Sequence, residues 1–208
     1  MTVAAWTVLV SASLLAYAYL VYPLLVLLLA RLFPRPVRAG DAAPSATVIV
    51  PALNEERVIE EKIENTLALD YPPGKVQLLV VSDGSTDRTA ELARRYAGRG
   101  VEVVEFPERR GKLAALLDAL PRARGEILVF SDASGMLRPG ALRAMAANFA
   151  DPEVGGVCGW YRSPGLERSG GAGELLYWDY EFAIKRAQSR WATLLGATGA
   201  MYALRRSL

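Results

Sequence analysis

The chain has 208 residues, of which 52% are hydrophobic, and its formal net charge at pH 7 is +2. This length suits one domain of ordinary size with a small addition. The balance of 24 basic and 22 acidic residues gives no basic stripe of the kind that binds nucleic acid, so no nucleic-acid partner is expected. With one cysteine and no histidine, the chain can form neither an internal disulfide nor a cysteine–histidine zinc site, and it has no histidine base.

Residues 1–33 are predicted to form a transmembrane anchor, single-pass or part of a multi-pass protein. Nothing from Met1 to Ala30 is charged, and about 20 apolar residues are enough to cross the hydrocarbon core. The positive charges, Arg31, Arg35 and Arg38, follow the apolar run, whereas a cleaved signal peptide carries its positive charge before it. Positive flanks stay in the cytoplasm, so we expect the domain on the cytoplasmic face of the inner cell membrane. The alternative, a buried core helix, rarely runs so long without a polar face.

Residues 34–45 are rich in proline and alanine and are predicted to be a linker, which leads into a domain over residues 46–208. In this domain, short apolar stretches alternate with stretches of helical periodicity. The predicted strands are residues 47–51, 76–82, 101–106 and 126–131, and the helices after them begin near Asn54, Asp87, Lys112 and Pro139. This alternation is typical of the α/β class, with a mostly parallel, Rossmann-like sheet flanked by helices.

Side-chain types and spacing predict how two of these helices begin and pack. Asn54 is predicted to be the N-cap of the first helix, because its side chain can accept a hydrogen bond from a free backbone N–H. In the third helix, Leu113, Leu116, Leu117 and Leu120 recur at helical spacing and are predicted to form its apolar stripe.

Polar residues stand where three of the predicted strands end. Asn54 and Glu55 follow the first strand, Asp83 the second and Asp132 the fourth. In a doubly wound sheet, ligands bind in the crevice beyond these carboxyl ends. Lys112 opens the third helix, where a positive side chain adds to backbone donors and suits a phosphate. Carboxylates suit a metal ion, a ribose hydroxyl or a base N–H, so the set predicts a site for a nucleotide diphosphate with a divalent ion.

The loop after the first strand argues against two other nucleotide-binding classes. Its sequence, PALNEE, contains neither a Gly-x-Gly-x-x-Gly motif nor a P-loop, so it does not predict a dinucleotide dehydrogenase. A nucleotidylyltransferase would need a basic, glycine-rich loop at this place, and the loop is acidic.

Five stretches resemble, in order, successive landmarks of the family 2 glycosyltransferases with the GT-A fold. They are VIVPALNEE, VVSDGSTDRT, RRGKLAALLDAL, GEILVFSDAS with LRPGALRAM, and GATGAMYALRR. The resemblance covers residues 46–206 and is greatest for membrane-bound members that build polysaccharides or glycolipids. It implies an inverting transferase of the hexosyltransferase type, which moves a sugar from a nucleotide-sugar, most simply a UDP-sugar, to a saccharide or lipid-linked acceptor.

Five of the predicted site residues take their roles from this resemblance. Pro51, Asn54 and Glu55 are implied to border the nucleotide. Asp83 is implied to accept a hydrogen bond from a uracil-type base. Lys112 is implied to reach the nucleotide from the third helix.

Asp132 resembles the first acid of the family's Asp-x-Asp motif, and we assign it the catalytic and metal-binding role. The resemblance implies that it contacts the ribose and a diphosphate bound by Mg²⁺ or Mn²⁺, whose charge offsets that of the leaving group. Where the family has a second acid, or an amide, this chain has Ser134, a weaker ligand for a hard cation. We therefore expect the metal to bind through Asp132 and Ser134, but less tightly than between two acids.

A general base is the part of the family pattern that this chain does not match. The family places this acid after the stretch that corresponds to GATGAMYALRR, and here no Asp or Glu follows Glu181. Asp179 and Glu181 could stand in, although they precede that stretch. We therefore expect the chain to be the nucleotide-binding front of a longer enzyme, incomplete at its C-terminus. The alternative is a non-catalytic or truncated module that binds a nucleotide-sugar only.

The segment 173–191 has two interpretations. Leu175, Trp178 and Phe182 recur at helical spacing with basic residues nearby, which is typical of an interfacial helix that lies against lipid. The same stripe is also typical of ordinary core packing.

Overall fold

A computed structural model describes residues 2–160, 172–197 and 200–208. The chain divides into two compact units. The first, here called the helical unit, comprises Met1–Val37 and Arg162–Gly196; the second, the sheet unit, comprises Arg38–Tyr161 and Ala197–Leu208.

Within its described residues, the sheet unit contains a six-stranded sheet in the order β3-β2-β1-β4-β6-β5. The strands are β1 (Ala46–Ala52), β2 (Val76–Asp83), β3 (Val101–Phe106), β4 (Ile127–Ser131), β5 (Gly156–Cys158) and β6 (Met201–Arg205). Strands β1 to β4 are parallel, β6 runs antiparallel to β4, and β5 runs antiparallel to β6. The predicted mostly parallel α/β sheet is thus confirmed, and an antiparallel pair that the periodicity did not predict extends it at one side.

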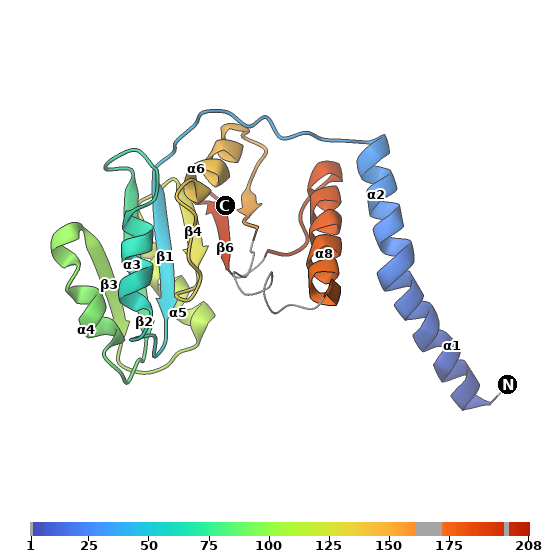
Figure 1. The fold of residues 1–208 in the computed structure, drawn as a ribbon, viewed down its shortest axis with the longest axis horizontal. Coiled ribbons are helices and arrows are strands. Elements are labelled where there is room, and N and C mark those ends of the chain that lie inside the picture. Colours follow the sequence, from blue (N-terminus) through green and yellow to red (C-terminus); the bar gives the residue numbers. More distant parts are fainter. Residues whose placement is uncertain (1, 161–171, 198–199) are drawn as a thin grey trace. The chain divides into compact units, whose positions relative to one another are not determined.

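Helices cover both faces of this sheet (Figure 1). They are α3 (Ile59–Leu67), α4 (Thr89–Arg94), α5 (Lys112–Ala119) and α6 (Ala141–Ala146), with short 3₁₀ turns at Ala97–Arg99, Leu120–Arg122 and Ala147–Ala150. Alternate side chains of β1 enter different cores: Val48 and Val50 pack with α3, α4 and α6, whereas Ile49 packs with α5. Because β1 is buried on both faces, its residues from Val48 to Ala52 form a continuous apolar run and do not alternate with polar residues.

Two predictions about the helices were wrong. Helix α3 begins only at Ile59, because Asn54 takes a left-handed backbone conformation with φ of 56° and belongs to the preceding loop. On α5, Leu116 is buried, but Leu113 and Leu117 are 73% and 55% exposed. The side of α5 that packs on the sheet carries Ala115, Leu116 and Ala119. Because the helix is apolar on nearly all sides, its sequence does not indicate which side will be buried.

The helical unit contains α1 (Val3–Ala16), a π-helical turn (Tyr17–Val21), α2 (Tyr22–Leu32) and α8 (Ala172–Trp191). The stretch Val3–Leu32 is the one described helix that is long and apolar enough to cross a membrane. Helix α8 packs along α2, where Val26 and Ala30 of α2 form a small buried cluster with Ala187 of α8. Small residues at this contact let the two backbones approach closely.

A proline explains the irregular turn between α1 and α2. Pro23 has no N–H to donate to the carbonyl of Tyr19, four residues before it, so that carbonyl is left without its helical partner. The hydroxyl of Tyr180 on α8 donates to this carbonyl at 2.8 Å. Helix α8 thus supplies the hydrogen bond that the proline removes.

Candidate active site

The carboxyl ends of β1, β2 and β4 lie side by side at one edge of the sheet. The order of the strands changes direction between β1 and β4, because β2 and β3 lie on one side of β1 and β4 on the other. The pairing of β1 with β2 continues to Ala52 and Ser82, but its pairing with β4 ends at Ile49 and Phe130. The strands therefore part at this point, next to Pro51.

Asn54 joins the loop after β1 to the loop after β2. Its backbone N–H donates to Oγ of Ser85 at 3.2 Å, and its side-chain oxygen accepts the backbone N–H of Thr86 at 2.8 Å. The left-handed φ of Asn54 suits an asparagine, which tolerates that region better than most residues. Asn54 thus holds the two loops together.

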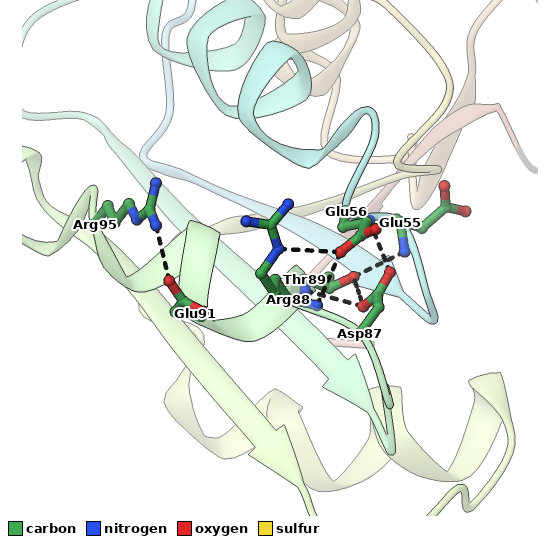
Figure 2. A network of polar contacts seen from close by, with 7 residues as sticks. All are labelled: Glu55, Glu56, Asp87, Arg88, Thr89, Glu91 and Arg95. Carbon is green, nitrogen blue, oxygen red and sulfur yellow. Dashed lines mark hydrogen bonds and ion pairs between the residues drawn. The ribbon is translucent and has the colours of Figure 1, made fainter.

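The same two loops exchange further hydrogen bonds, which Figure 2 shows. The N–H groups of Glu55 and Glu56 donate to Oγ1 of Thr89 at 2.8 Å and to Oδ2 of Asp87 at 3.1 Å. In return, the carboxylate of Glu56 accepts the N–H of Arg88 at 3.2 Å. The Glu55 carboxylate points away from this network (Figure 2), so it does not take part in joining the loops.

Asp83, the last residue of β2, fixes the loop before α5. It is 5% exposed, and its two carboxylate oxygens accept the N–H groups of Arg110 at 2.7 Å and Gly111 at 2.9 Å. Gly84 allows this loop to approach: its φ is +68°, and a Cβ at this residue would lie 2.3 Å from the backbone nitrogen of Arg109. Asp83 therefore determines where α5 and its first residue, Lys112, begin.

Lys112 and Asp132 meet at the sheet edge. The Nζ of Lys112 lies 2.6 Å from Oδ1 of Asp132, and the two side chains are 56% and 38% exposed. The structure thus brings together two of the predicted site residues, from α5 and from the end of β4. Asp83 lies in the same region, but each of its carboxylate oxygens already accepts a hydrogen bond from a backbone N–H.

Tyr202 of β6 is a neighbour of this pair that the sequence did not single out. Its ring stacks on Phe130, with ring centroids 4.8 Å apart. Burial raises the pKa of Tyr202, and the charges of Lys112 and Asp132 act on it in opposite directions. Tyr202 belongs to GATGAMYALRR, the last of the five stretches, and this was the one indication in the sequence that it lies near the site.

Lys62 is a second neighbour that the sequence analysis missed. It is fully buried on α3, and its Nζ donates to Oγ of Ser131 at 2.7 Å and to the carbonyl of Gly135. Burial lowers the pKa of Lys62 to about 8, against the opposing effect of Asp132. Among the glutamates of EEKIEN it resembles a surface residue, yet it lies three residues after Ile59, on the buried face of the helix, and that spacing could have found it.

The metal ligands predicted in this region are few. Ser134 is exposed and Asp132 partly exposed, and no group of three His, Cys, Asp or Glu side chains suited to a metal ion occurs in the described parts of the chain. One carboxylate and one hydroxyl are hard oxygen ligands. Mg²⁺ is commonly bound by one or two carboxylates together with substrate phosphates and water. The residues present therefore fit a divalent ion shared with a diphosphate, and not an ion held by protein alone.

The two acids considered as stand-ins for a general base, Asp179 and Glu181, lie on α8 in the helical unit. Glu181 pairs with Lys185 one turn later, at 2.6 Å. Leu176 and Tyr177 of the same helix are exposed, while Ala187 and Gln188 are buried. The side chain of Gln188 donates to the hydroxyl of Tyr22 at 2.7 Å, so the last half of α8 packs against α2.

Comparisons with known proteins point to one family. The family model described as glycosyl transferase family 2 matches residues 47–208. An N-acetylglucosaminyltransferase of Azorhizobium caulinodans is 30% identical over 171 residues, 79% of this chain and 43% of that protein. A poly-β-1,6-N-acetyl-D-glucosamine synthase of Staphylococcus aureus is 32% identical over 121 residues, 57% of this chain and 29% of that protein. The chain thus spans less than half the length of these curated relatives.

Two solved structures are similar over most of the chain. A mannosyltransferase from Pyrobaculum calidifontis, in complex with GDP-Man and Mn²⁺, has a TM-score of 0.76 and 32% identity, covering 94% of this chain and 55% of its own. Glucosyl-3-phosphoglycerate synthase from Mycobacterium tuberculosis, in complex with Mn²⁺, UDP and phosphoglyceric acid, has a TM-score of 0.54 and 28% identity, covering 80% and 57%.

Proposed function

Because the chain belongs to glycosyl transferase family 2, we propose that it binds a nucleotide-sugar, a UDP-sugar, and takes part in the inverting transfer of its sugar to a saccharide or lipid-linked acceptor. The observation that carries this proposal is the meeting of Lys112 and Asp132 at the edge where β1 and β4 part. A cation and a carboxylate that are both accessible to solvent match the two needs of a diphosphate with its metal.

Asp132 and Ser134 are the residues that would hold a divalent metal, Mg²⁺ or Mn²⁺. When bound, such an ion offsets the negative charge that the leaving diphosphate gains. Lys112, which is exposed and held by Asp132 alone among the contacts described for its side chain, would turn to the diphosphate. The similar mannosyltransferase and synthase were both solved with Mn²⁺, which supports a metal here.

The nucleotide is proposed to lie beyond the ends of β1 and β2. Pro51 and Asn54 border this region, and the Glu55 carboxylate, which is free of the loop network, is available to a ribose or a base. Asp83 is proposed to accept a base N–H through the lone pairs that its two backbone bonds leave. UDP is the proposed nucleotide, and GDP, the nucleotide part of the mannosyltransferase ligand, is its competitor in the test.

The membrane and domain assignments belong to the same proposal. Residues 1–33 are proposed to anchor the chain, residues 34–45 to link, and residues 46–208 to hold the donor site. The apolar helix Val3–Leu32 and the arginines that follow it support a donor site on the cytoplasmic side.

A non-catalytic nucleotide-sugar-binding module is the second candidate. Ser134 stands where the metal motif of the family has a second acid or an amide, and a hydroxyl binds a hard cation more weakly. Such a module would bind the donor as proposed but would not turn it over.

Calorimetric titration of UDP, GDP and dTDP, with and without Mn²⁺, tests the proposed donor site. We expect UDP to bind more tightly with Mn²⁺ and this gain to disappear in Asp132→Ala. Asp70→Ala is the matched control, since Asp70 pairs with Arg143 at the surface. Failure of all three nucleotides to bind, or an unchanged Mn²⁺ gain in Asp132→Ala, would contradict the proposal.

Release of UDP separates the two candidates. UDP-glucose and UDP-N-acetylglucosamine are incubated with the chain, together with a membrane lipid extract or soluble oligosaccharides. Release that depends on an added acceptor and on Asp132 supports the transferase. Tight binding of the nucleotide without any release supports the module.

A further inference from the structure

Lys62 is the largest of the fully buried side chains in the described part of the molecule. It lies on the face of α3 that packs on the sheet, together with Ile59, Ile63 and Thr66. A buried ammonium loses its hydration, which costs several kcal/mol unless its hydrogens find acceptors. A methionine of similar length would fill the same space without this cost. The reason for a lysine at this place is therefore to be sought in the groups that accept hydrogen bonds from its ammonium.

The ammonium bonds both ends of one short loop. At the beginning of the loop it donates to Oγ of Ser131 at 2.7 Å, and at the end it donates to the carbonyl of Gly135. Asp132 and Ser134, the residues proposed to hold the metal, lie between these two contacts. The N–H of Gly135 also donates to the carbonyl of Asp132 at 3.1 Å, which closes the loop as a tight turn.

One of these contacts extends to a third segment. The hydroxyl of Ser131 accepts from the lysine and donates to the carbonyl of Ala200 at 3.0 Å. Ala200 directly precedes β6. Lys62 is thus connected to the loop after β4 and, through one hydroxyl, to the start of the neighbouring strand.

We propose that Lys62 is a positioning residue of the donor site: by bonding both ends of the loop 131–135, its ammonium holds Asp132 and Ser134 in the arrangement that a divalent metal and the donor diphosphate require. This role rests on the proposed function of the chain. Correct placement of the ligands matters more in this site than in a site with two carboxylates, because one carboxylate and one hydroxyl bind a hard cation weakly. Residues that orient metal ligands in this way commonly change metal affinity by about 10–100-fold when they are replaced.

The test measures how much Mn²⁺ tightens nucleotide binding. Dissociation constants of UDP and GDP are determined by calorimetry, with and without saturating Mn²⁺, on the 208-residue chain. The variants are Lys62→Met, Ser131→Ala and the double variant. Lys75→Met is the matched control, since the Nζ of Lys75 donates to the carbonyl of Ala43 at 2.7 Å, near the start of β2 and away from the carboxyl edge. Thermal unfolding of each variant shows whether it is folded.

We expect Lys62→Met to reduce the Mn²⁺-dependent gain in affinity about 10-fold, the lower end of the usual effect of such residues. Ser131→Ala should lose part of the same gain, and the double variant should lose no more than Lys62→Met, since both act on one loop. Lys75→Met should keep the full gain. If Lys62→Met does not fold, Ser131→Ala decides the question by losing or keeping its Mn²⁺ gain.

Three results would overturn the role of Lys62. The first is a folded Lys62→Met with the wild-type Mn²⁺ gain. The second is a loss of affinity that is equal with and without Mn²⁺, because a general structural effect would not be specific to the metal. The third, a wild-type chain that binds neither nucleotide, overturns the proposed function itself and the role of Lys62 with it. The first two leave the proposed function in place.

Discussion

The ammonium of Lys112 lies 2.6 Å from Oδ1 of Asp132, so the cation proposed for the diphosphate is paired with the acid proposed for the metal. Both side chains are substantially exposed, and exposed ion pairs contribute only about 0–1 kcal/mol. A metal on Asp132 would therefore displace a weakly held partner and free it for the phosphate. Under the proposed function, Lys112 would compete with the metal when the donor is absent and would assist it when the donor is bound.

Lys112→Met should separate these two effects. Loss of one charge-assisted hydrogen bond to a phosphate costs about 1.5–3 kcal/mol, so we expect UDP to bind at least about 10-fold more weakly. Mn²⁺ alone should bind as tightly as before or more tightly, because its competitor for Asp132 is gone. Electron paramagnetic resonance of free Mn²⁺ measures the second quantity, with Lys75→Met as control. A parallel loss of Mn²⁺ affinity would show that the two side chains do not compete.

Gly84→Ala should destabilise the sheet unit more than a change of conformation alone explains. A Cβ at Gly84 would lie 2.3 Å from the backbone nitrogen of Arg109, whereas a Cβ at Gly74 would meet nothing within 4 Å. Both glycines have positive φ, which costs a residue with a side chain about 1–2 kcal/mol. We expect Gly74→Ala to show this cost and Gly84→Ala to exceed it, at about 3 kcal/mol. Urea denaturation measures the free energy of unfolding of both variants. Equal losses in this free energy would show that the loop at Arg109 moves aside at no cost.

Glu126 should make the sheet unit sensitive to acid. The backbone N–H of Ser45, at 3.0 Å, and then its hydroxyl, at 2.9 Å, lower the pKa of Glu126 below its ordinary value of 4.5. A lowered pKa in the folded state stabilises the protein fully above pH 4.5, and this contribution is lost as the pH falls through the folded value. Glu126→Gln should therefore lower the urea midpoint at pH 7, and its difference from wild type should shrink in acid. Glu61→Gln, at an exposed residue of α3, is the control, and a difference that is constant with pH would contradict the assignment.

Tyr180→Phe should weaken the pairing of α2 with α8. The variant removes the hydroxyl that bonds the Tyr19 carbonyl, at a cost of about 0.5–1.5 kcal/mol. In Pro23→Ala, the restored N–H can bond that carbonyl, so a further change to Tyr180→Phe should have little effect. Unfolding in detergent, followed by circular dichroism, measures the cycle. Tyr177→Phe, at an exposed tyrosine of the same helix, is the control, and additive losses would show that Tyr180 does not replace the missing bond.

The sequence predicts the parallel half of the sheet well, because β1, β2 and β4 are mostly apolar and buried on both faces. Strands β2 and β4 also end at polar residues, Asp83 and Ser131. The positions of Asp83 and Asp132 follow directly from those strand ends. The antiparallel half does not follow, since β5 is only three residues long, with a glycine at its start. A strand this short is not long enough to show an alternation of apolar and polar residues.

The parts of the site that the sequence does not predict depend on contacts between distant residues. Lys62 is charged, so its residue type does not predict that it is buried. Its burial depends on acceptors at Ser131 and Gly135, about 70 residues later in the chain. Asn54 looks like a helix cap, but its bonds to Ser85 and Thr86 hold it in the loop instead. In each case a tertiary hydrogen bond overrides the local preference of the residue.

The hydrogen bonds between the loops after β1 and β2 also bear on the thermodynamics of recognition. Because Asn54, Glu55 and Glu56 already bond the 85–89 segment, their backbone is ordered before any ligand arrives. A nucleotide that enters there does not have to bear the entropy of arranging these residues. Substitutions such as Thr89→Val should therefore appear chiefly as faster dissociation of the ligand, with a less favourable entropy of binding.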